Sequence, residues 1–265
     1  MILSGRWGSK RAQNWVLFAG LAAVFIFAIK ETGADPVELV RGMPNLWDYI
    51  RSGFPPNFAK ILQMGPYLLE SFWVATASIF WAVLGSLGLA LLAARNVNKN
   101  KVTRKLFQSL ISAFRSTHPM VYALVFVSAV GLGPFAGVLG LVFHTMGALG
   151  RYFTEAFENV DPGVIEAGVA VGARKWQVIL YFLIPEAFPY LLGYSFYYFE
   201  YCIRQSTMLG LVGAGGIGRP LMTAIRLFKT KDVFAILFLI MAIVVVLDTV
   251  VTKIRKRVLG SEGAL

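Results

Sequence analysis

The chain has 265 residues, of which 57% are hydrophobic and 15% are charged, and its formal net charge is +11. Soluble domains usually carry about 25% charged residues, so the composition excludes an ordinary water-soluble fold, and the excess apolar surface must face lipid or a partner. The single cysteine excludes a disulfide framework within the chain and a thiol-rich metal site. The basic residues lie between apolar runs instead of in one patch, which favours a membrane surface over nucleic acid as their partner.

Six segments are apolar enough to cross a bilayer, for which about 20 residues of helix are needed. The first follows three basic residues and resembles a signal peptide, but no small-residue cleavage site follows it, so we expect a retained span. Residues 116–150 hold no charge and are too long for one span; Gly131–Pro134 predicts a turn that divides them. The six expected spans are 14–29, 71–94, 110–130, 135–149, 187–203 and 233–251.

The positions of the basic residues predict the orientation of these spans. With the N-terminus inside, more of them fall in cytoplasmic segments than outside, so the positive-inside rule supports two cytoplasmic termini. A second outer group goes against this trend and is either functional or a sign that the last loop is wrongly placed: Arg204, Arg219, Arg226, Lys229 and Lys231.

We expect a single membrane domain, residues 1–265. Residues 1–65 hold the first span and an outer connection, and residues 66–257 form the core. The proline-rich stretch 31–65 predicts an irregular or interfacial connection with a short helix near 36–41.

Residues 161–185, between the fourth and fifth expected spans, predict two short helices on the cytoplasmic face. Asp161 followed by Pro162 indicates a helix start, because a carboxylate caps free N–H groups and proline loses no hydrogen bond in the first turn. Gly172 suits the end of that helix. A second helix, 175–183, is expected to stop at the proline that ends the segment.

This segment resembles the EAA loop of the permeases of ABC importers, whose pattern is Glu-Ala-Ala, three residues, Gly, nine residues and Ile-x-Leu-Pro. Here Glu166-Ala167 is followed by Gly168 in place of the second alanine, and then by Gly172. After the nine-residue spacing comes Phe-Leu-Ile-Pro at 182–185, so the spacing matches and three positions are relaxed. The small residues of the first helix would allow another protein to approach closely.

The resemblance implies an all-α polytopic membrane protein with about six transmembrane helices and the type I ABC importer permease fold. In that family the loop forms a coupling helix that docks into a groove on the ATPase subunit. ATP and Mg²⁺ then belong to that partner, and no cofactor is expected on this chain. An amphipathic loop without a partner is the alternative. The implied ATPase-coupling residues are Asp161, Glu166, Ala167, Gly168, Gly172 and Pro185.

Three further segments are similar to the phosphonate and phosphite importer permeases: 114–119 (Phe-Arg-Ser-Thr-His-Pro), 130–139 (from Val-Gly-Leu-Gly-Pro-Phe) and 209–218 (from Leu-Gly-Leu-Val-Gly-Ala). This resemblance covers about 71–257. It implies import of a phosphonate, phosphite or related small oxyanion, a homodimeric pore in the bacterial inner membrane, two ATP-binding cassette subunits and an extracytoplasmic binding protein. Methionine-type permeases carry a similar glycine run, so an importer of methionine or another small solute is the alternative.

Two polar residues lie in the third expected span. A central arginine costs roughly 2.5–3.5 kcal/mol on insertion scales, so Arg115 needs a compensating role. Either its guanidinium lines the path of an anionic substrate, whose oxygens it would bind bidentately, or it snorkels to the headgroups. His118, one turn further on, is either a substrate contact or a structural hydrogen bonder, and it could keep the helix locally open together with Pro119.

A second polar group lies at the outer end of the fifth expected span. Arg204, Ser206 and Thr207 predict a patch that receives an anion. Glu200, four residues before Arg204, would hold the guanidinium in place. A purely structural ion pair is the alternative.

The glycine-rich run 209–218 predicts backbone that turns back at membrane depth, which is tolerated only where protein or water covers it. The expected gate or re-entrant residues are Gly210, Gly213, Gly215, Gly216 and Gly218. The run also fits the dinucleotide pattern G-x-G-x-x-G, but a membrane helix precedes it instead of a strand, so no cofactor is expected. The sequence holds no phosphate-binding P-loop motif, so the chain itself should not hydrolyse ATP.

Two other classes of membrane protein are less consistent with the sequence. An intramembrane enzyme needs a nucleophile and base or a set of metal ligands, and only His118 and His144 are available, on different expected spans. A secondary transporter commonly shows inverted repeats and midplane carboxylates, whereas Glu200 and Asp248 lie near span ends. We therefore expect neither catalytic nor metal-binding residues.

Overall fold

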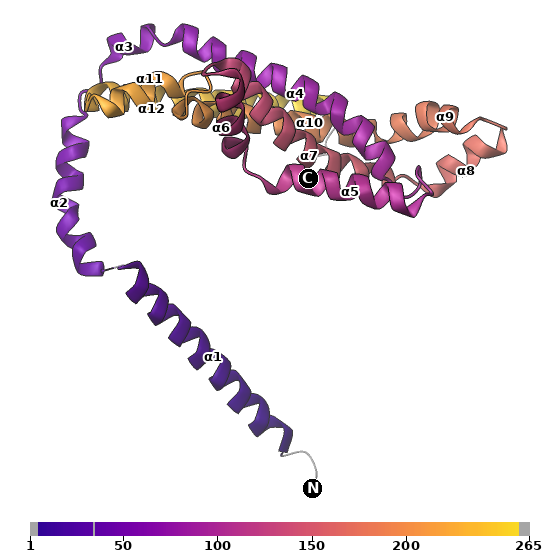
Figure 1. Cartoon of the computed structure of the whole chain (residues 1–265), viewed down its shortest axis with the longest axis horizontal. Helices are drawn as coiled ribbons and strands as arrows, with labels where there is room; N and C mark the ends of the chain where they lie inside the picture. The colour runs from indigo at the N-terminus through magenta and orange to yellow at the C-terminus, as the bar shows by residue number, and fades with distance from the viewer. Residues whose placement is uncertain (1–4, 34, 260–265) are drawn as a thin grey trace. The chain divides into compact units, whose positions relative to one another are not determined.

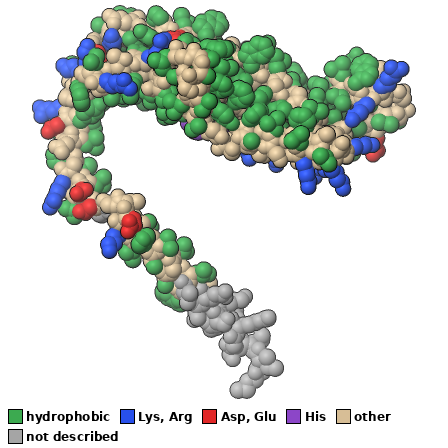
Figure 2. All heavy atoms as spheres, viewed as in Figure 1, with side chains coloured by type: hydrophobic (Ala, Val, Ile, Leu, Met, Phe, Trp, Pro, Cys, Tyr) green, Lys and Arg blue, Asp and Glu red, His purple; other side chains and the backbone are tan. Residues whose placement is uncertain are grey.

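The computed structural model describes residues 5–33 and 35–259, and every regular element within them is a helix (Figure 1). The predicted all-α class is therefore confirmed. The chain divides into two compact units, Met1–Ser52 and Gly53–Leu265. In the second unit, Figure 2 shows hydrophobic side chains over the middle and Lys and Arg gathered toward the ends, as lipid around the middle would require.

The first unit holds α1 (Gly5–Thr32) and α2 (Pro36–Ser52). Helix α1 contains the expected first span. Helix α2 is longer than the short helix predicted at 36–41, and it continues through Pro44. Its apolar residues recur at helical spacing on one face, and Leu39 and Trp47 on that helix are exposed. An amphipathic helix, instead of an irregular connection, thus follows α1.

The second unit contains the remaining helices in chain order. They are α3 (Phe58–Leu62), α4 (Gly65–Ala93), α5 (Lys101–Ser116), α6 (Pro119–Val130), α7 (Pro134–Glu158), α8 (Pro162–Ala170), α9 (Lys175–Val178), α10 (Ile184–Leu211), α11 (Gly218–Arg226) and α12 (Thr230–Leu259). A π-helical turn, Ile179–Leu183, joins α9 to α10.

Helix α7 is the centre of this unit and contacts α4, α5, α6 and α10 (Figure 1). Small residues let the backbones approach closely: a Cβ added at Gly140 would lie 2.8 Å from the backbone nitrogen of Ala123 on α6. On the opposite side, the Oγ atoms of Ser78 and Ser86 on α4 lie 3.4 and 3.1 Å from carbonyl oxygens of α7. Close packing and hydroxyl contacts therefore fix α7 between its neighbours.

Among the residues that the structure describes, three helices are long and apolar enough to cross a membrane, namely α4, the continuous helix Lys175–Leu211 and Thr230–Lys253. Two bent helix pairs raise the number to five, compared with the six spans predicted from the sequence. Helix α7, expected as a span at 135–149, is not among them. Its glycines, His144 and Arg151 make it less apolar, and neighbouring helices of the same chain bury many of its residues.

The prediction of one continuous span at 110–130 is wrong. The chain bends by 87° between α5 and α6. Thr117 and His118 are extended, as expected before a proline, and Pro119 opens α6. The Nδ1 atom of His118 accepts a hydrogen bond from the backbone N–H of Met120 (3.2 Å), so His118 caps the new helix.

The expected helix stop at Ile184-Pro185 is also wrong, because the helix that starts at Lys175 continues to Leu211. A proline inside an α-helix removes one hydrogen bond and clashes with the carbonyl four residues earlier. The wider π turn at Ile179–Leu183 lies where this clash would occur and accommodates Pro185. The fifth expected span, 187–203, is thus the middle of a much longer helix.

Replacing Gly140 by alanine should lower the thermal stability of the purified chain, because its new Cβ would overlap the backbone of α6. Overpacking of this kind costs about 1–3 kcal/mol. The matched control is Gly88→Ala on α4, where nothing lies within 4 Å of the added Cβ and alanine favours the helix. Thermal unfolding in detergent measures both variants. Equal stability of the two would contradict the close contact between α6 and α7.

Candidate functional site

The segment 161–185 forms a capped helix–turn–helix (Figure 1). The Oδ1 atom of Asp161 accepts a hydrogen bond from the backbone N–H of Gly163 at 2.8 Å, and Pro162 occupies the first turn of α8. Gly172 has φ +77°, a left-handed conformation that ends the helix. At the start of α9, Oε1 of Gln177 accepts from the backbone N–H of Arg174 at 2.7 Å. Local sequence therefore determines this part of the fold, as predicted.

The α8–α9 segment presents an exposed face away from the helices it joins. Glu166 and Ala167 are exposed on α8, and so are the large apolar side chains of Val169, Val171 and Trp176. Exposed apolar side chains grouped beside charged ones mark an interaction surface. We refer to these five residues as the α8 face.

Gly168 does not belong to the α8 face, which corrects the expectation that its small size serves another protein. It is buried, and a Cβ added there would lie 3.1 Å from the ring of Phe182 in the π turn. Its missing side chain therefore lets α8 pack against the start of the long helix of its own chain. Pro185 is exposed at the beginning of α10, directly after the π turn that accommodates it.

Arg115 is exposed in the last turn of α5, so it lies at the bend before α6 and not in the middle of one straight helix as expected. The bend that follows it is held by His144 on α7, whose Nδ1 lies 2.9 Å from the carbonyl oxygen of Thr117. Since a carbonyl only accepts, Nδ1 donates, and Nε2 of the neutral ring accepts from the hydroxyl of Tyr201 on α10 at 3.2 Å. His144 and Tyr201 thus tie the bend between α5 and α6 to two other helices.

Glu200 and Arg204 form an ion pair one turn apart on α10, as the spacing predicts. Glu200 is largely covered, and Arg204 is exposed. Ser206 does not join them, because it is buried and its hydroxyl donates to the carbonyl of Ile203 at 2.7 Å. Two residues along a helix is a rotation of about 200°, so Ser206 faces the bundle interior. Thr207 is half-buried and remains near Arg204 on the helix surface.

The glycine run forms a turn between α10 and α11 that turns the backbone back on itself. Gly213, Gly215 and Gly216 have φ values of +83°, +88° and +74°, which residues with a side chain rarely adopt. The carbonyl of Gly213 accepts a hydrogen bond from the N–H of Gly133 at 3.0 Å. A Cβ at Gly215 would lie 2.8 Å from Cα of Pro134. This turn, residues 212–217, is therefore covered by the start of α7.

The start of α4 covers the same turn from a second side. Ser71 Oγ accepts from the N–H of Ile217 at 3.0 Å. One residue earlier, Glu70 accepts two hydrogen bonds, at 2.7 and 2.6 Å, from the guanidinium of Arg219, which also lies 5.8 Å from the ring centroid of Tyr67. By sequence alone, Arg219 belongs to the outer basic group that goes against the positive-inside trend. The sequence does offer one sign of its partner, because Glu70 is a single carboxylate directly before the second expected span.

At the other end of the bundle, Glu158 holds the loop after α4 against the end of α7. Its carboxylate accepts from the backbone N–H and the guanidinium of Arg95, both at 2.8 Å. Burial raises the pKa of Glu158, but the hydrogen bonds and the positive charge of Arg95 outweigh it, so the pKa lies below its ordinary value. The two residues of this pair are 63 positions apart, so no local spacing predicts it.

The chain is similar in sequence to a family of membrane transport proteins and to two phosphite transport permeases. Residues 86–260 match the family described as binding-protein-dependent transport system inner membrane component. The putative phosphite transport system permease protein HtxC of Stutzerimonas stutzeri is 37% identical over 85% of this chain and 80% of its own length. The phosphite transport system permease protein PtxC of the same organism is 35% identical over 84% of this chain and 81% of its own length.

A solved structure, an inward-facing conformation of the MetNI methionine ABC transporter, is similar in fold. One of its chains matches with a TM-score of 0.66 and 21% identity, over 75% of this chain and 97% of that chain. The helical arrangement is therefore the type I ABC importer permease fold.

The ion pair of Glu158 predicts a dependence of stability on pH. Because its pKa is lowered in the folded chain, its stabilising contribution is present above the unfolded value of about 4.3 and is lost as pH falls through the folded pKa. The unfolding temperature of the wild type should therefore fall between about pH 5 and pH 3 more steeply than that of Glu158→Gln. The control is Glu166→Gln, which removes an exposed carboxylate and should retain the wild-type dependence. Parallel curves for wild type and Glu158→Gln would disprove this role.

Proposed function

We propose that this chain is the permease of an ATP-driven importer and transports phosphonate, phosphite or a similar small oxyanion. The chain belongs to the family of binding-protein-dependent transport system inner membrane components. The observation that supports this substrate class is the similarity to two phosphite transport permease proteins over more than four fifths of the chain. The chain is a non-catalytic membrane subunit, as its relatives are permease proteins.

The α8 face docks onto a separate ATPase subunit, which binds ATP and Mg²⁺. Its exposed apolar residues supply contact area, and Glu166 supplies a charge that has no ion-pair partner among the described residues. Gly172 permits the turn that presents α8, and Asp161 caps it. Two such subunits serve a homodimer of the permease.

Movement of the α8 face reaches the membrane through one continuous element. Gly168 lets α8 pack against Phe182 in the π turn, and that turn belongs to the helix Lys175–Leu211 of 37 residues. At 1.5 Å per residue this helix is roughly 55 Å long. It carries Arg204 and ends at the glycine turn, so a displacement at one end is transmitted to both.

The substrate path passes Arg204, held by Glu200, with Thr207 beside it. Arg115 and His118 contribute at the bend between α5 and α6, where extended backbone interrupts the helices. The glycine turn, with Gly210 and Gly218 packed against each other, acts as a gate. An extracytoplasmic binding protein delivers the oxyanion, both termini are cytoplasmic, and the chain acts as one domain in a bacterial inner membrane.

Replacing Gly172 by valine should uncouple the transporter, because a β-branched residue strains the left-handed turn that positions α8. Gly172→Asn is the matched control, since asparagine tolerates this conformation. With the ATPase subunit co-expressed, Gly172→Val should reach the membrane yet lose both co-purified ATPase and uptake, whereas Gly172→Asn retains them. Normal assembly and uptake by the valine variant would reject the coupling role.

Replacing Arg204 by alanine should raise the KM for uptake of an oxyanion about tenfold or more, as expected for a lost hydrogen bond to a charged group. Arg226→Ala on α11 removes an equal charge from an exposed residue and should leave uptake unchanged. Membrane vesicles with the cognate ATPase and binding protein would be supplied with labelled phosphite, phosphonate, phosphate or methionine. Uptake of methionine alone would overturn the substrate class, and an unaltered KM for Arg204→Ala would overturn the assignment of that residue.

A further inference from the structure

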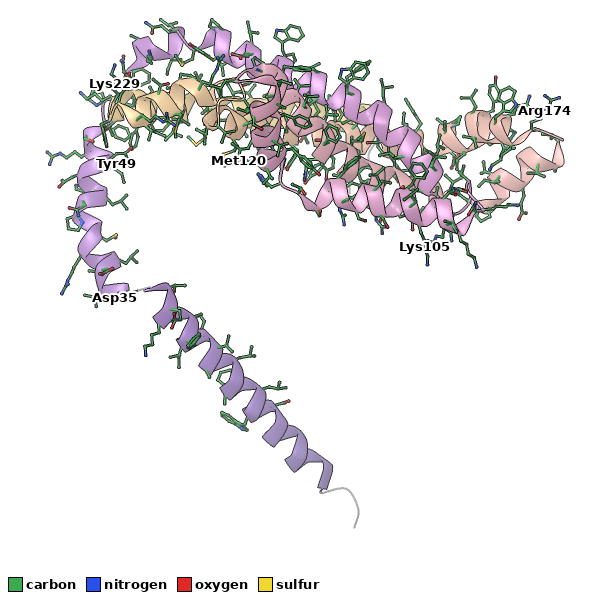
Figure 3. All side chains as sticks on the ribbon, viewed as in Figure 1. Asp35, Tyr49, Lys105, Met120, Arg174 and Lys229 are labelled. Carbon is green, nitrogen blue, oxygen red and sulfur yellow. The ribbon has the colours of Figure 1, made fainter. Side chains whose placement is uncertain are left out.

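An open cavity of about 540 Å³ lies at the end of the second unit that carries α8. It is formed by the loop after α4, by α5 and by the end of α7, and its lining is mostly charged: Arg95, Arg104, Lys105, Gln108, Arg151, Glu155, Glu158 and Asn159. Figure 3 labels Lys105 on α5 and Arg174 at the turn between α8 and α9, toward the same end of the unit. None of the residues assigned to coupling or to the substrate path lines this cavity.

The charges of the cavity are not balanced. Its two carboxylates are already paired, Glu158 with Arg95 at 2.7 Å and Glu155 with Arg151 at 2.6 Å. Arg104 and Lys105 have no ion-pair partner among the residues that the structure describes. Two unpaired positive charges, one of them on a half-buried side chain, thus face a space that is large enough for a small ligand.

The polar groups beside these charges suit an oxyanion with several acceptor atoms. Arg104 offers a planar set of donors that matches phosphate oxygens in pairs, and Lys105 adds a compact charge. Gln108, one turn from Arg104, is held in place because its amide nitrogen donates to the carbonyl of Ala93 at 3.1 Å. A hydrogen bond therefore joins two of the elements that form the cavity, α5 and the end of α4.

The outward side of α5 indicates where such an anion comes from. Val102, Leu106 and Leu110 recur every fourth residue and expose 77%, 64% and 37% of their surface. An exposed apolar row beside lysine and arginine on one helix is typical of a helix at the surface of an anionic membrane. Acyl chains would cover the apolar row while a headgroup reaches the basic residues.

We propose that this cavity binds a phosphate group, the chemistry shared by the headgroup of an anionic phospholipid and by free inorganic phosphate. The apolar row of α5 favours the lipid. A bound headgroup holds α5 against the membrane surface, next to the bend that leads into α6. The position of the cavity on the cytoplasmic side rests on the proposed function, whereas binding of the phosphate group does not.

The test measures binding by the purified full chain, without ATPase, of a short-chain phosphatidylglycerol, the matching phosphatidylcholine and inorganic phosphate. Arg104→Gln combined with Lys105→Gln removes the two unpaired charges. The affinity for phosphatidylglycerol should then fall about 30-fold, given the usual contribution of each basic residue near an anionic lipid. Lys99→Gln combined with Lys101→Gln is the matched control, because it removes the same charge from residues outside the lining and should change the affinity less than about threefold.

The lipid and phosphate arms distinguish the two sources. Binding of phosphatidylglycerol that millimolar phosphate does not displace identifies the lipid, and displacement by phosphate shows that the phosphate group alone suffices. The proposal is overturned if phosphatidylglycerol and phosphatidylcholine bind equally while phosphate does not bind, or if the double variant at Arg104 and Lys105 binds like wild type or no worse than its control. Thermal unfolding without ligand establishes that both variants are folded. Because no transport is measured, loss of the proposed import activity leaves this result unaffected.

Discussion

The close packing of α7 against four other helices is the constraint on which the rest of the structure depends. In a membrane the hydrophobic effect does not drive helices together, so small residues and hydroxyl groups must provide the contact. Gly140 and Gly147 bring α7 against α6 and α5, and serines of α4 lie against its carbonyls. Helix α7 is therefore less apolar than a lipid-facing span. Its polar residue His144 forms a hydrogen bond with the carbonyl of Thr117 and so holds the bend between α5 and α6.

A second dependence links the two ends of the bundle. The glycine turn at 212–217 consists of irregular backbone, which a membrane protein tolerates only where protein or water covers it. The starts of α4 and α7 provide that cover through Ser71 and Gly133. Because the turn ends the helix that begins at Lys175, the position of the α8 face and the position of the turn are not independent. A rigid connection of this kind is what the proposed coupling to a separate ATPase requires.

Several charged residues lie at the ends of helices, where they form ion pairs. Ion pairs fasten the ends of helices, with Glu70 and Arg219 at the glycine turn and Glu158 and Arg95 at the other end. In both pairs the carboxylate is mostly covered while the arginine is exposed, so each pair fixes where a helix end lies and adds modestly to stability. Arg104 and Lys105 are different because they lack such partners among the described residues and face a cavity.

The sequence by itself determined those features that neighbouring residues specify. The cap at Asp161, the break at Gly172, the glycine turn and the pair Glu200–Arg204 all depend on spacings of a few residues, so local rules predict them. Tertiary structure alone decided the rest. The pairs of Arg219 with Glu70 and Arg95 with Glu158 join residues 149 and 63 positions apart. Three further features also depend on tertiary packing: the burial of Gly168 and Ser206, the bend held by His144, and the continuation of the helix through Pro185. Packing partners that are distant in sequence determine which side of a helix is covered, so local rules do not predict these features.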